Sequence, residues 1–269
     1  VAFSLVLLTI DVGNTQTVLG LYDLDSRSGE GASAGLVDHW RLSTDAERTS
    51  DEYSVIVRSL LDTVDVDFDH GLLGAAVCSG VPRILVNLRH MITRYQPFEP
   101  VVIEPGAKTG MPILYDNPKE VGADRLANAI AAYDLYGGPT VVVDFGTGNN
   151  FDVISENGEF LGGAIAPGIE ISLDALFGRA AALRAVELTE PRNVIGKSTV
   201  ESIQSGTVYG FAAMIDGMVR RFADELGDIN VVATGGLAHL ILPVSETLKH
   251  NEPFLTLHGL RIVHQRNQR

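Results

Sequence analysis

Two short segments of this chain end an apolar run in aspartate and then turn through glycine. Asp11 and Gly13 form the first such turn, and Asp144 and Gly146 form the second, 133 residues later (144 − 11). A carboxylate is a hard oxygen ligand for a cation, and a glycine turn lets backbone N–H groups approach phosphate oxygens. Aspartate and glycine are also ordinary turn residues, but their recurrence after matching strands favours a nucleotide site. We expect the two turns to face one cleft and to hold a triphosphate there.

A third turn contains two consecutive glycines. Gly235 and Gly236 follow the apolar run Val231–Ala233 and lead into an expected helix. Consecutive glycines permit close approach of a flat ring or a ribose, although a strand-to-helix turn without a ligand uses the same residues. Together with Asp11 and Asp144, they resemble the phosphate-1, phosphate-2 and adenosine motifs of the superfamily of acetate and sugar kinases, heat-shock 70 proteins and actin. The chain has no Gly-x-x-x-x-Gly-Lys-Ser/Thr sequence, so it is not a P-loop protein.

A polar segment in mid-chain, residues 115–128, supplies a candidate base. It is typical of a proline-containing loop followed by a helix, with Asp124 and Arg125 in the first helical turn. An aspartate there can simply complement the helix dipole, which stabilises a helix by roughly 0.3–1 kcal/mol. It can also accept a proton from a substrate hydroxyl, while the arginine holds an anionic or polar substrate group. The residues alone leave both interpretations open.

The elements that must position these residues repeat, which predicts a duplicated α/β architecture. Each half begins with a hairpin and continues into a mixed sheet flanked by helices. A period of 133 residues is too long for a solenoid, so we expect two related domains, residues 1–128 and 129–269. The further strands that we predict are His39–Leu42, Leu72–Val77, Pro100–Ile103, Glu159–Ala166, Asn230–Ala233 and Arg261–Val263. The predicted helices are Ser50–Val64, Pro82–Tyr95, Val121–Leu135, Ile169–Leu183, Thr199–Leu226 and Leu237–Leu248. Residues 26–35, rich in glycine and serine, indicate a long loop with nothing to pack.

Composition and charge exclude several kinds of partner. The formal net charge is -14 and no lysine and arginine cluster is present, so we expect no nucleic-acid partner. The apolar run Ser4–Ile10 is far shorter than the roughly 20 residues of a membrane span, and no signal-peptide pattern frames it. The single cysteine, Cys78, fits a reducing compartment and a small buried role. The histidines show no zinc spacing. We therefore expect a cytoplasmic protein with no membrane partner.

Four motifs in a fixed order resemble the markers of type III pantothenate kinases. They are Asp-x-Gly-Asn-Thr at 11–15, Gly-Ala-Asp-Arg at 122–125, Asp-x-Gly-Thr at 144–147 and Gly-Lys-Ser-Thr at 196–199. The resemblance implies duplicated ribonuclease H-like domains of the actin-like ATPase class, with the nucleotide cleft between them. It also implies an enzyme that transfers the γ-phosphoryl group of ATP to the primary hydroxyl of pantothenate. The product would be 4′-phosphopantothenate, in the first step of coenzyme A synthesis.

The same resemblance implies a role for each site residue. Asp124 would be the general base, Asp11 a ligand of Mg²⁺, and Asp144 the ligand of a monovalent cation, K⁺ or NH₄⁺. The residues implied for ATP are Asp11, Val12, Gly13, Asn14, Thr15, Gln16, Thr17, Val18 and Thr147. The residues implied for pantothenate are Tyr115, Gly122, Ala123, Asp124, Arg125 and Thr199. In this family the pantothenate pocket is completed across a homodimer interface, so we expect a homodimer.

Two features depart from the family pattern, and two other functions stay open. Gly148 and Asn149 stand where the family has a small residue and then threonine. We expect Asn149 to donate to phosphate instead, with binding kept and the rate lowered. The loop of residues 26–35 is longer than this hairpin needs.

A regulatory relative acting as a transcription accessory factor would have no need of Asp124 as a base, so the presence of Asp124 with Arg125 favours the kinase. A kinase for another substrate, such as a sugar, would be distinguished by a substrate panel.

Overall fold

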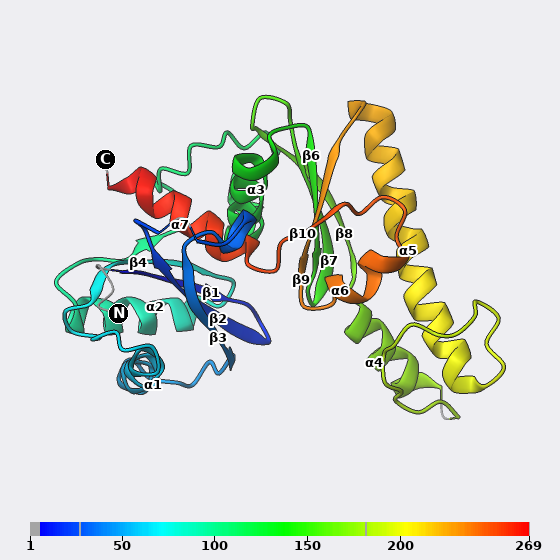
Figure 1. Ribbon diagram of the computed structural model, residues 1–269, viewed down its shortest axis with the longest axis horizontal. Helices are drawn as coiled ribbons and strands as arrows, with labels where there is room; N and C mark the ends of the chain where they lie inside the picture. The colour runs from blue at the N-terminus through cyan, green and yellow to red at the C-terminus, as the bar shows by residue number, and fades with distance from the viewer. Residues whose placement is uncertain (1–5, 27, 181, 269) are drawn as a thin grey trace. The chain divides into compact units, whose positions relative to one another are not determined.

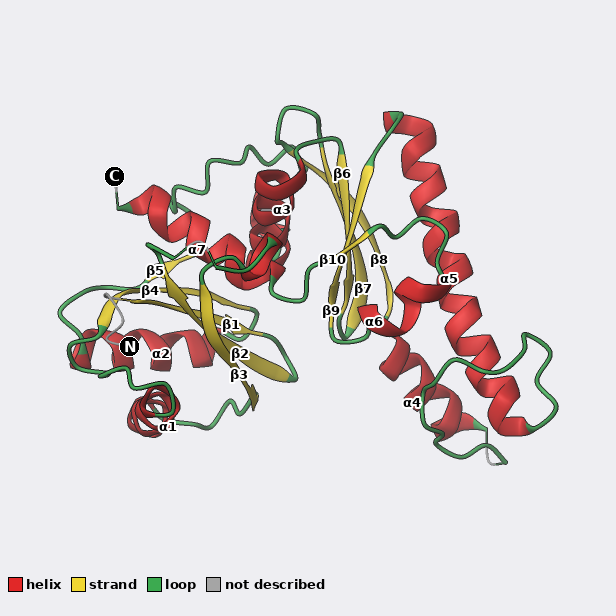
Figure 2. Ribbon diagram, viewed as in Figure 1, coloured by secondary structure: helices red, strands yellow, loops and turns green. Residues whose placement is uncertain are grey.

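The computed structural model describes residues 6–26, 28–180 and 182–268, which form two compact units. The first unit contains the described residues up to Ala131 and those from Phe254 onward, and the second is Ala132–Pro253. The boundary falls within the helix α3 (Ala123–Tyr136). Figures 1 and 2 show the helices and strands of each unit. In the described part of the chain, no helix combines the length and the apolar character needed to cross a membrane.

The first unit is built on a five-stranded sheet with helices on its two faces. Its strands are β1 (Val6–Val12), β2 (Gln16–Asp23), β3 (Leu36–Ser43), β4 (Leu72–Ser79) and β5 (Val101–Val102). Its other helices are η1 (Gly31–Ser33), α1 (Ser50–Asp62), α2 (Pro82–Tyr95), η2 (Pro118–Glu120) and α7 (Leu255–Asn267). The strand order is β3-β2-β1-β4-β5. β1 pairs antiparallel with β2 and parallel with β4, while β2–β3 is antiparallel and β4–β5 parallel. Figure 1 shows α1 and α2 on one face of this sheet and α7 on the other.

The central strand β1 is apolar because both of its faces are covered. Leu8 and Ile10 belong to a buried cluster that includes Tyr53 of α1 and Leu88 of α2. Leu7 points to the opposite face and is fully buried as well. Burial on both faces accounts for the nearly continuous apolar run before the first glycine turn.

The second unit repeats this arrangement. Its strands are β6 (Thr140–Phe145), β7 (Gly148–Ile154), β8 (Phe160–Pro167), β9 (Asn230–Gly235) and β10 (His250–Asn251). Its helices are α4 (Ile169–Arg179), α5 (Thr199–Leu226), α6 (Ala238–Ile241) and η3 (Leu242–Val244). The strand order is β10-β9-β6-β7-β8. β6 lies between antiparallel β7 and parallel β9, as β1 lies between β2 and β4. The outer pairs, antiparallel β7–β8 and parallel β9–β10, also match. The equal order and directions confirm the predicted fold class of two mixed sheets, each flanked by helices.

Two helices have the predicted bounds because the sequence marks their ends. α2 begins at Pro82, whose fixed φ suits a first helical turn. α5 follows Ser198, whose side chain accepts a hydrogen bond from the N–H of Glu201. Gly227, with φ 83°, ends α5 in a conformation that glycine adopts readily.

Two elements near the C-terminus differ from the predictions. Residues Arg261–Val263 were expected to form a strand, but they lie inside α7. Leu260 and His264 lie one helical turn apart and are both buried, which is the spacing of a helix. A run of three residues is too short to show this spacing. The predicted helix Leu237–Leu248 is also wrong, since only α6 and the short η3 form there. Pro243 accounts for this break, because it cannot donate within a helix.

The loop of residues 26–35 packs against the first unit, contrary to the prediction that nothing in it can pack. Ala32 lies in η1 and is fully buried. The hydroxyl of Tyr22 donates to Ala32 O at 3.0 Å, and the guanidinium of Arg261 donates to Ala34 O at 2.6 Å. That guanidinium also lies 5.2 Å from the centre of the Tyr22 ring. One loop position, Arg27, falls outside the described residues.

Candidate active site

The first glycine turn joins β1 to β2 and places Asp11 at the carboxyl end of β1. The N–H of Gly13 donates to Gln16 O at 3.0 Å, and a Cβ on Gly13 would lie 3.1 Å from that oxygen. The turn is therefore too tight to accept a side chain at Gly13 without a shift. Asn14, Thr15 and Gln16 are exposed residues of this turn, which a ligand can reach.

Thr44 holds this turn in place, and no sequence pattern pointed to it. Its hydroxyl donates to Gly13 O at 2.7 Å and shares a 3.0 Å hydrogen bond with the hydroxyl of Thr17. Its N–H donates to Thr15 O at 2.9 Å. Thr17 is fully buried and Val12 nearly so. The side chains of these two predicted ATP-binding residues therefore face the interior, and the turn can offer a ligand only their backbone groups.

Cys78 connects two of the predicted functional carboxylates. It lies on β4 opposite Asp11, and its thiol donates to Asp11 Oδ1 at 3.2 Å. Burial raises the pKa of the Cys78 thiol, and the negative charges of Asp11 and then Asp124 raise this pKa further. Both carboxylates therefore act on one neutral, fully buried thiol. The sequence predicted the burial of Cys78, but it contained no signal for its position beside Asp11.

Asp124 and Arg125 occupy the first turn of α3, as the sequence predicted. The N–H of Arg125 donates to Asp124 Oδ1 at 2.9 Å. A Cβ on Gly122 would lie 2.5 Å from the same oxygen, so Gly122 leaves the space that the carboxylate occupies. Asp124, Gly122 and Ala123 are partly exposed, whereas Arg125 is 8% exposed. Tyr115, also partly exposed, precedes η2 in the same unit.

The second glycine turn joins β6 to β7 and places Asp144 at the carboxyl end of β6. The N–H of Gly146 donates to Gly148 O at 3.2 Å, which closes the turn. Thr147 is exposed at its tip, and Thr147 O accepts from the N–H of Gly168, directly before α4, at 3.0 Å. Thr147 is therefore accessible to a ligand while its backbone is held by the start of a helix.

Gly235 packs directly against Asp144, which unites the second and third glycine turns. β9 runs parallel to β6, so Thr234 lies beside Asp144 and Gly235 beside Phe145. Gly235 has φ 89°, and a Cβ there would lie 2.6 Å from Asp144 Oδ1 and 2.7 Å from backbone atoms of Phe145. Among the described residues, chain neighbours aside, no heavy atom lies within 4 Å of a Cβ placed on Gly236. Glycine at 235 thus leaves room for the carboxylate, and the surface at Gly236 is open.

The donors at these two strand ends suit cations and phosphate. Asp11 and Asp144 are partly exposed carboxylates, each beside a glycine turn that contains exposed residues. Within residues 6–26, 28–180 and 182–268, no group of three or more His, Cys, Asp or Glu side chains could hold a metal ion. Mg²⁺ commonly uses only one or two protein carboxylates, with substrate phosphates and water as its other ligands. Single carboxylates here are therefore compatible with a phosphate-bound cation.

Thr199 lies in the second unit, whereas the other residues implied for pantothenate lie in the first. It is the first residue of α5, directly after the N-cap Ser198, and it is exposed. The N–H of Lys197 donates to Glu201 Oε2 at 2.9 Å, and Arg192 forms an ion pair with the same glutamate. Glu201 thus holds the segment that presents Thr199.

Asn149 is the one predicted phosphate contact that the structure contradicts. Its side chain is fully buried in β7, and neither amide atom has a hydrogen-bond partner among the described residues. Residues two apart in a strand share a face, and Phe151 belongs to the buried cluster of the second unit. Asn149 therefore points into this core rather than toward a bound phosphate.

Comparisons with known proteins agree with this geometry. A family model described as type III pantothenate kinase matches residues 7–221. The chain belongs to this family. It is 53% identical to a type III pantothenate kinase of Streptomyces griseus, over 97% of this chain and 98% of that protein. It is 55% identical to a type III pantothenate kinase of Parafrankia sp., again over 97% and 98% of the two chains. No finding supports the regulatory alternative.

Solved structures of low sequence identity share the fold. One is a Campylobacter jejuni protein described as a Baf family transcriptional activator, with a TM-score of 0.59, 16% identity and coverage of 97% and 98% of the two chains. Another is component A of (R)-2-hydroxyglutaryl-CoA dehydratase from Acidaminococcus fermentans, with a TM-score of 0.57, 13% identity and coverage of 98% and 100%. At these identities the similarity shows the fold alone, and it agrees with two ribonuclease H-like units in this type III pantothenate kinase family member.

Proposed function

We propose that this chain catalyses ATP-dependent phosphorylation of pantothenate to 4′-phosphopantothenate, the first step of coenzyme A synthesis. Membership of the type III family supports the reaction. The structural observation that carries the proposal is the carboxylate of Asp11 at the end of β1, which accepts from the Cys78 thiol beside the exposed turn Asn14–Gln16. A cation ligand beside an exposed glycine turn suits phosphoryl transfer, which depends mainly on alignment and charge neutralisation. We place the reaction in the cytoplasm, which the single cysteine favours.

In this proposal ATP is bound by residues 11–18 and by Thr147. The exposed turn Asn14–Gln16 directs amides and polar side chains to phosphate oxygens. Asp11 is the protein ligand of Mg²⁺, and the thiol of Cys78 fixes its Oδ1. When bound, Mg²⁺ neutralises phosphate charge.

Asp124 is the general base in this proposal. Its carboxylate accepts the proton of the pantothenate hydroxyl as the new oxygen–phosphorus bond forms. The space left by Gly122 and the hydrogen bond from the N–H of Arg125 orient Asp124 Oδ1. Tyr115, Ala123 and Arg125 bind the rest of pantothenate, together with Gly122 and Thr199.

Asp144 holds the monovalent cation, K⁺ or NH₄⁺, in this proposal. Its carboxylate lies at the end of β6 against Gly235, where a side chain would occupy the carboxylate's space. A large monovalent cation prefers oxygen ligands, which the carboxylate and the neighbouring backbone carbonyls supply. Activity should therefore respond to K⁺ as well as to Mg²⁺.

We further propose a homodimer assembled through the second unit. Large apolar side chains are exposed on β8, on α4, in the segment that leads into α5 and at the start of α5, namely Ile165, Ile171, Leu176, Val194, Ile195 and Val200. Exposed apolar residues of this kind mark protein interfaces. Ile195→Asp should give a monomer of low activity, whereas Val55→Asp, at an exposed apolar site on α1, should stay dimeric. Sedimentation velocity separates these outcomes, and a wild-type monomer would refute the homodimer.

Pantothenate-dependent ADP release, measured with Mg²⁺ and with or without K⁺, tests the proposed reaction. Asp124→Asn should bind ATP normally and lose turnover by about 10²–10⁴-fold, the usual contribution of a positioned base. Asp62→Asn removes a similar charge at the exposed end of α1 and serves as the control. Absence of product from folded wild-type protein would refute the kinase. Unchanged turnover of the Asp124→Asn variant would show that Asp124 is not the general base.

A further inference from the structure

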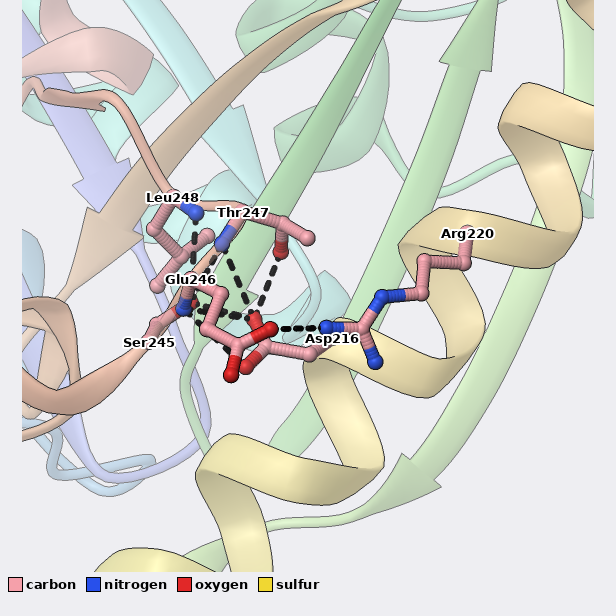
Figure 3. Close-up of polar contacts among 6 residues, drawn as sticks. All are labelled: Asp216, Arg220, Ser245, Glu246, Thr247 and Leu248. Atoms are coloured by element: carbon pink, nitrogen blue, oxygen red, sulfur yellow. Dashed lines mark hydrogen bonds and ion pairs between the residues drawn. The ribbon is translucent and has the colours of Figure 1, made fainter.

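A buried carboxylate in α5 binds one turn of the chain that follows the third glycine motif (Figure 3). Asp216 is 5% exposed. Its Oδ1 accepts from the hydroxyls of Ser245 at 2.6 Å and Thr247 at 2.7 Å, and from the N–H of Thr247 at 3.1 Å. Its Oδ2 accepts from the N–H of Glu246 at 3.0 Å. One carboxylate therefore receives hydrogen bonds from three successive residues.

These hydrogen bonds keep Asp216 charged in a buried position. Burial by itself raises the pKa of Asp216, but the hydrogen bonds from Ser245, Glu246 and Thr247 outweigh it, and the net pKa is lowered. Hydrogen bonds to a charged group are stronger than those between neutral groups. An exposed ion pair between Arg220 and Glu246 also joins α5 to this turn, but exposed pairs contribute little. Asp216 is therefore the main polar link between α5 and the turn.

The turn is connected by hydrogen bonds back to the glycine motif. The N–H of Ser245 donates to Ile241 O at 3.0 Å, at the end of α6. At the start of α6, His239 Nδ1 lies 3.0 Å from Gly236 O, a hydrogen-bond distance. The short helices α6 and η3 thus lie between two fixed points, Gly236 at the end of β9 and Ser245 on Asp216. A short helix held at both ends keeps the open surface at Gly236 in one conformation.

We propose that Asp216 is a positioning residue for the adenosine part of ATP. It fixes the segment after Gly235–Gly236 to α5, so that these glycines present an ordered surface to the base and ribose. The inference rests on the proposed function, in which ATP is the phosphoryl donor, and on the resemblance of Gly235–Gly236 to an adenosine motif. Asp216 does not contact the ligand, so its loss weakens recognition of the adenosine and leaves recognition of the phosphates unchanged.

The test compares two ligands of the full-length protein by isothermal titration calorimetry, ATP and inorganic tripolyphosphate. Asp216→Asn keeps the shape of the side chain but turns an amide N–H₂ toward donors. We expect it to weaken ATP binding about tenfold, within the usual range of coupling between sites, and to leave tripolyphosphate binding unchanged. In steady-state assays KM for ATP should rise, while KM for pantothenate stays constant. The control Asp224→Asn removes an exposed carboxylate from the same helix and should leave the affinity for both ligands unchanged.

A milder variant keeps the inference testable if Asp216→Asn does not fold. Thr247→Val removes one hydroxyl donor to Asp216 and should weaken ATP binding in the same direction by a smaller factor. Equal weakening of ATP and tripolyphosphate, or unchanged ATP binding by a folded Asp216→Asn variant, would overturn the inference. Wild-type protein that binds ATP no better than tripolyphosphate would overturn it as well. Wild-type protein that binds ATP but does not phosphorylate pantothenate would refute the proposed function alone.

Discussion

Replacing Gly235 with alanine tests whether the second unit holds Asp144 for a cation. The φ of 89° at Gly235 costs a residue with a side chain about 1–2 kcal/mol. The added Cβ would lie 2.6 Å from Asp144 Oδ1 and 2.7 Å from backbone N and C of Phe145. Such overpacking costs about 1–3 kcal/mol. The two contributions sum to a destabilisation of about 2–5 kcal/mol, with the carboxylate of Asp144 displaced.

Two measurements check this prediction. Urea unfolding followed by circular dichroism gives the change in the free energy of unfolding, and ADP release at increasing K⁺ gives the half-saturating K⁺ concentration. Gly235→Ala should lower the free energy of unfolding and raise the half-saturating K⁺ concentration. Gly210→Ala is the matched control, because Gly210 lies in α5 and, its own helix backbone aside, no described atom lies within 4 Å of a Cβ there. Its free energy of unfolding should rise by about 0.5–1 kcal/mol. A Gly235→Ala variant with wild-type stability and wild-type K⁺ response would refute the reasoning.

Three further predictions follow from buried polar groups. Thr44→Val removes the hydroxyl that donates to Gly13 O and shares a hydrogen bond with the buried hydroxyl of Thr17. It should raise KM for ATP, since an unsatisfied buried group costs about 1–3 kcal/mol; an unchanged KM would show that the turn needs no such support. Asn149→Val removes an amide with no partner among the described residues and should raise the free energy of unfolding in urea by about 1–3 kcal/mol; a less stable variant would contradict this interpretation. Burial lowers the pKa of His264, so below about pH 6.5 the unfolded chain takes up a proton that the folded chain does not. Stability should therefore fall as pH falls through this range, and less steeply in His264→Gln; equal slopes in urea titrations would exclude the His264 contribution.

Local sequence patterns predicted elements whose signals are short-range. The bounds of α2 and α5 follow from Pro82, Ser198 and Gly227, which mark helix ends through backbone preferences that hold in any fold. The strand expected at Arg261–Val263 failed for the opposite reason. A run of three residues, of which only Ile262 and Val263 are β-branched, is too short to show a helical or strand period. Packing in the first unit selected the helix α7.

The sequence by itself determined the two hairpins, their duplication and the family. An apolar strand that ends in aspartate and turns through glycine is complete within a dozen residues, and Asp11 and Asp144 could be read directly from it. The tertiary structure alone decided which distant residues support those carboxylates. Parallel pairing of β1 with β4 brings Cys78 to Asp11, and parallel pairing of β6 with β9 brings Gly235 to Asp144. Such neighbours depend on strand register across long intervening segments, for which a single sequence contains no local signal.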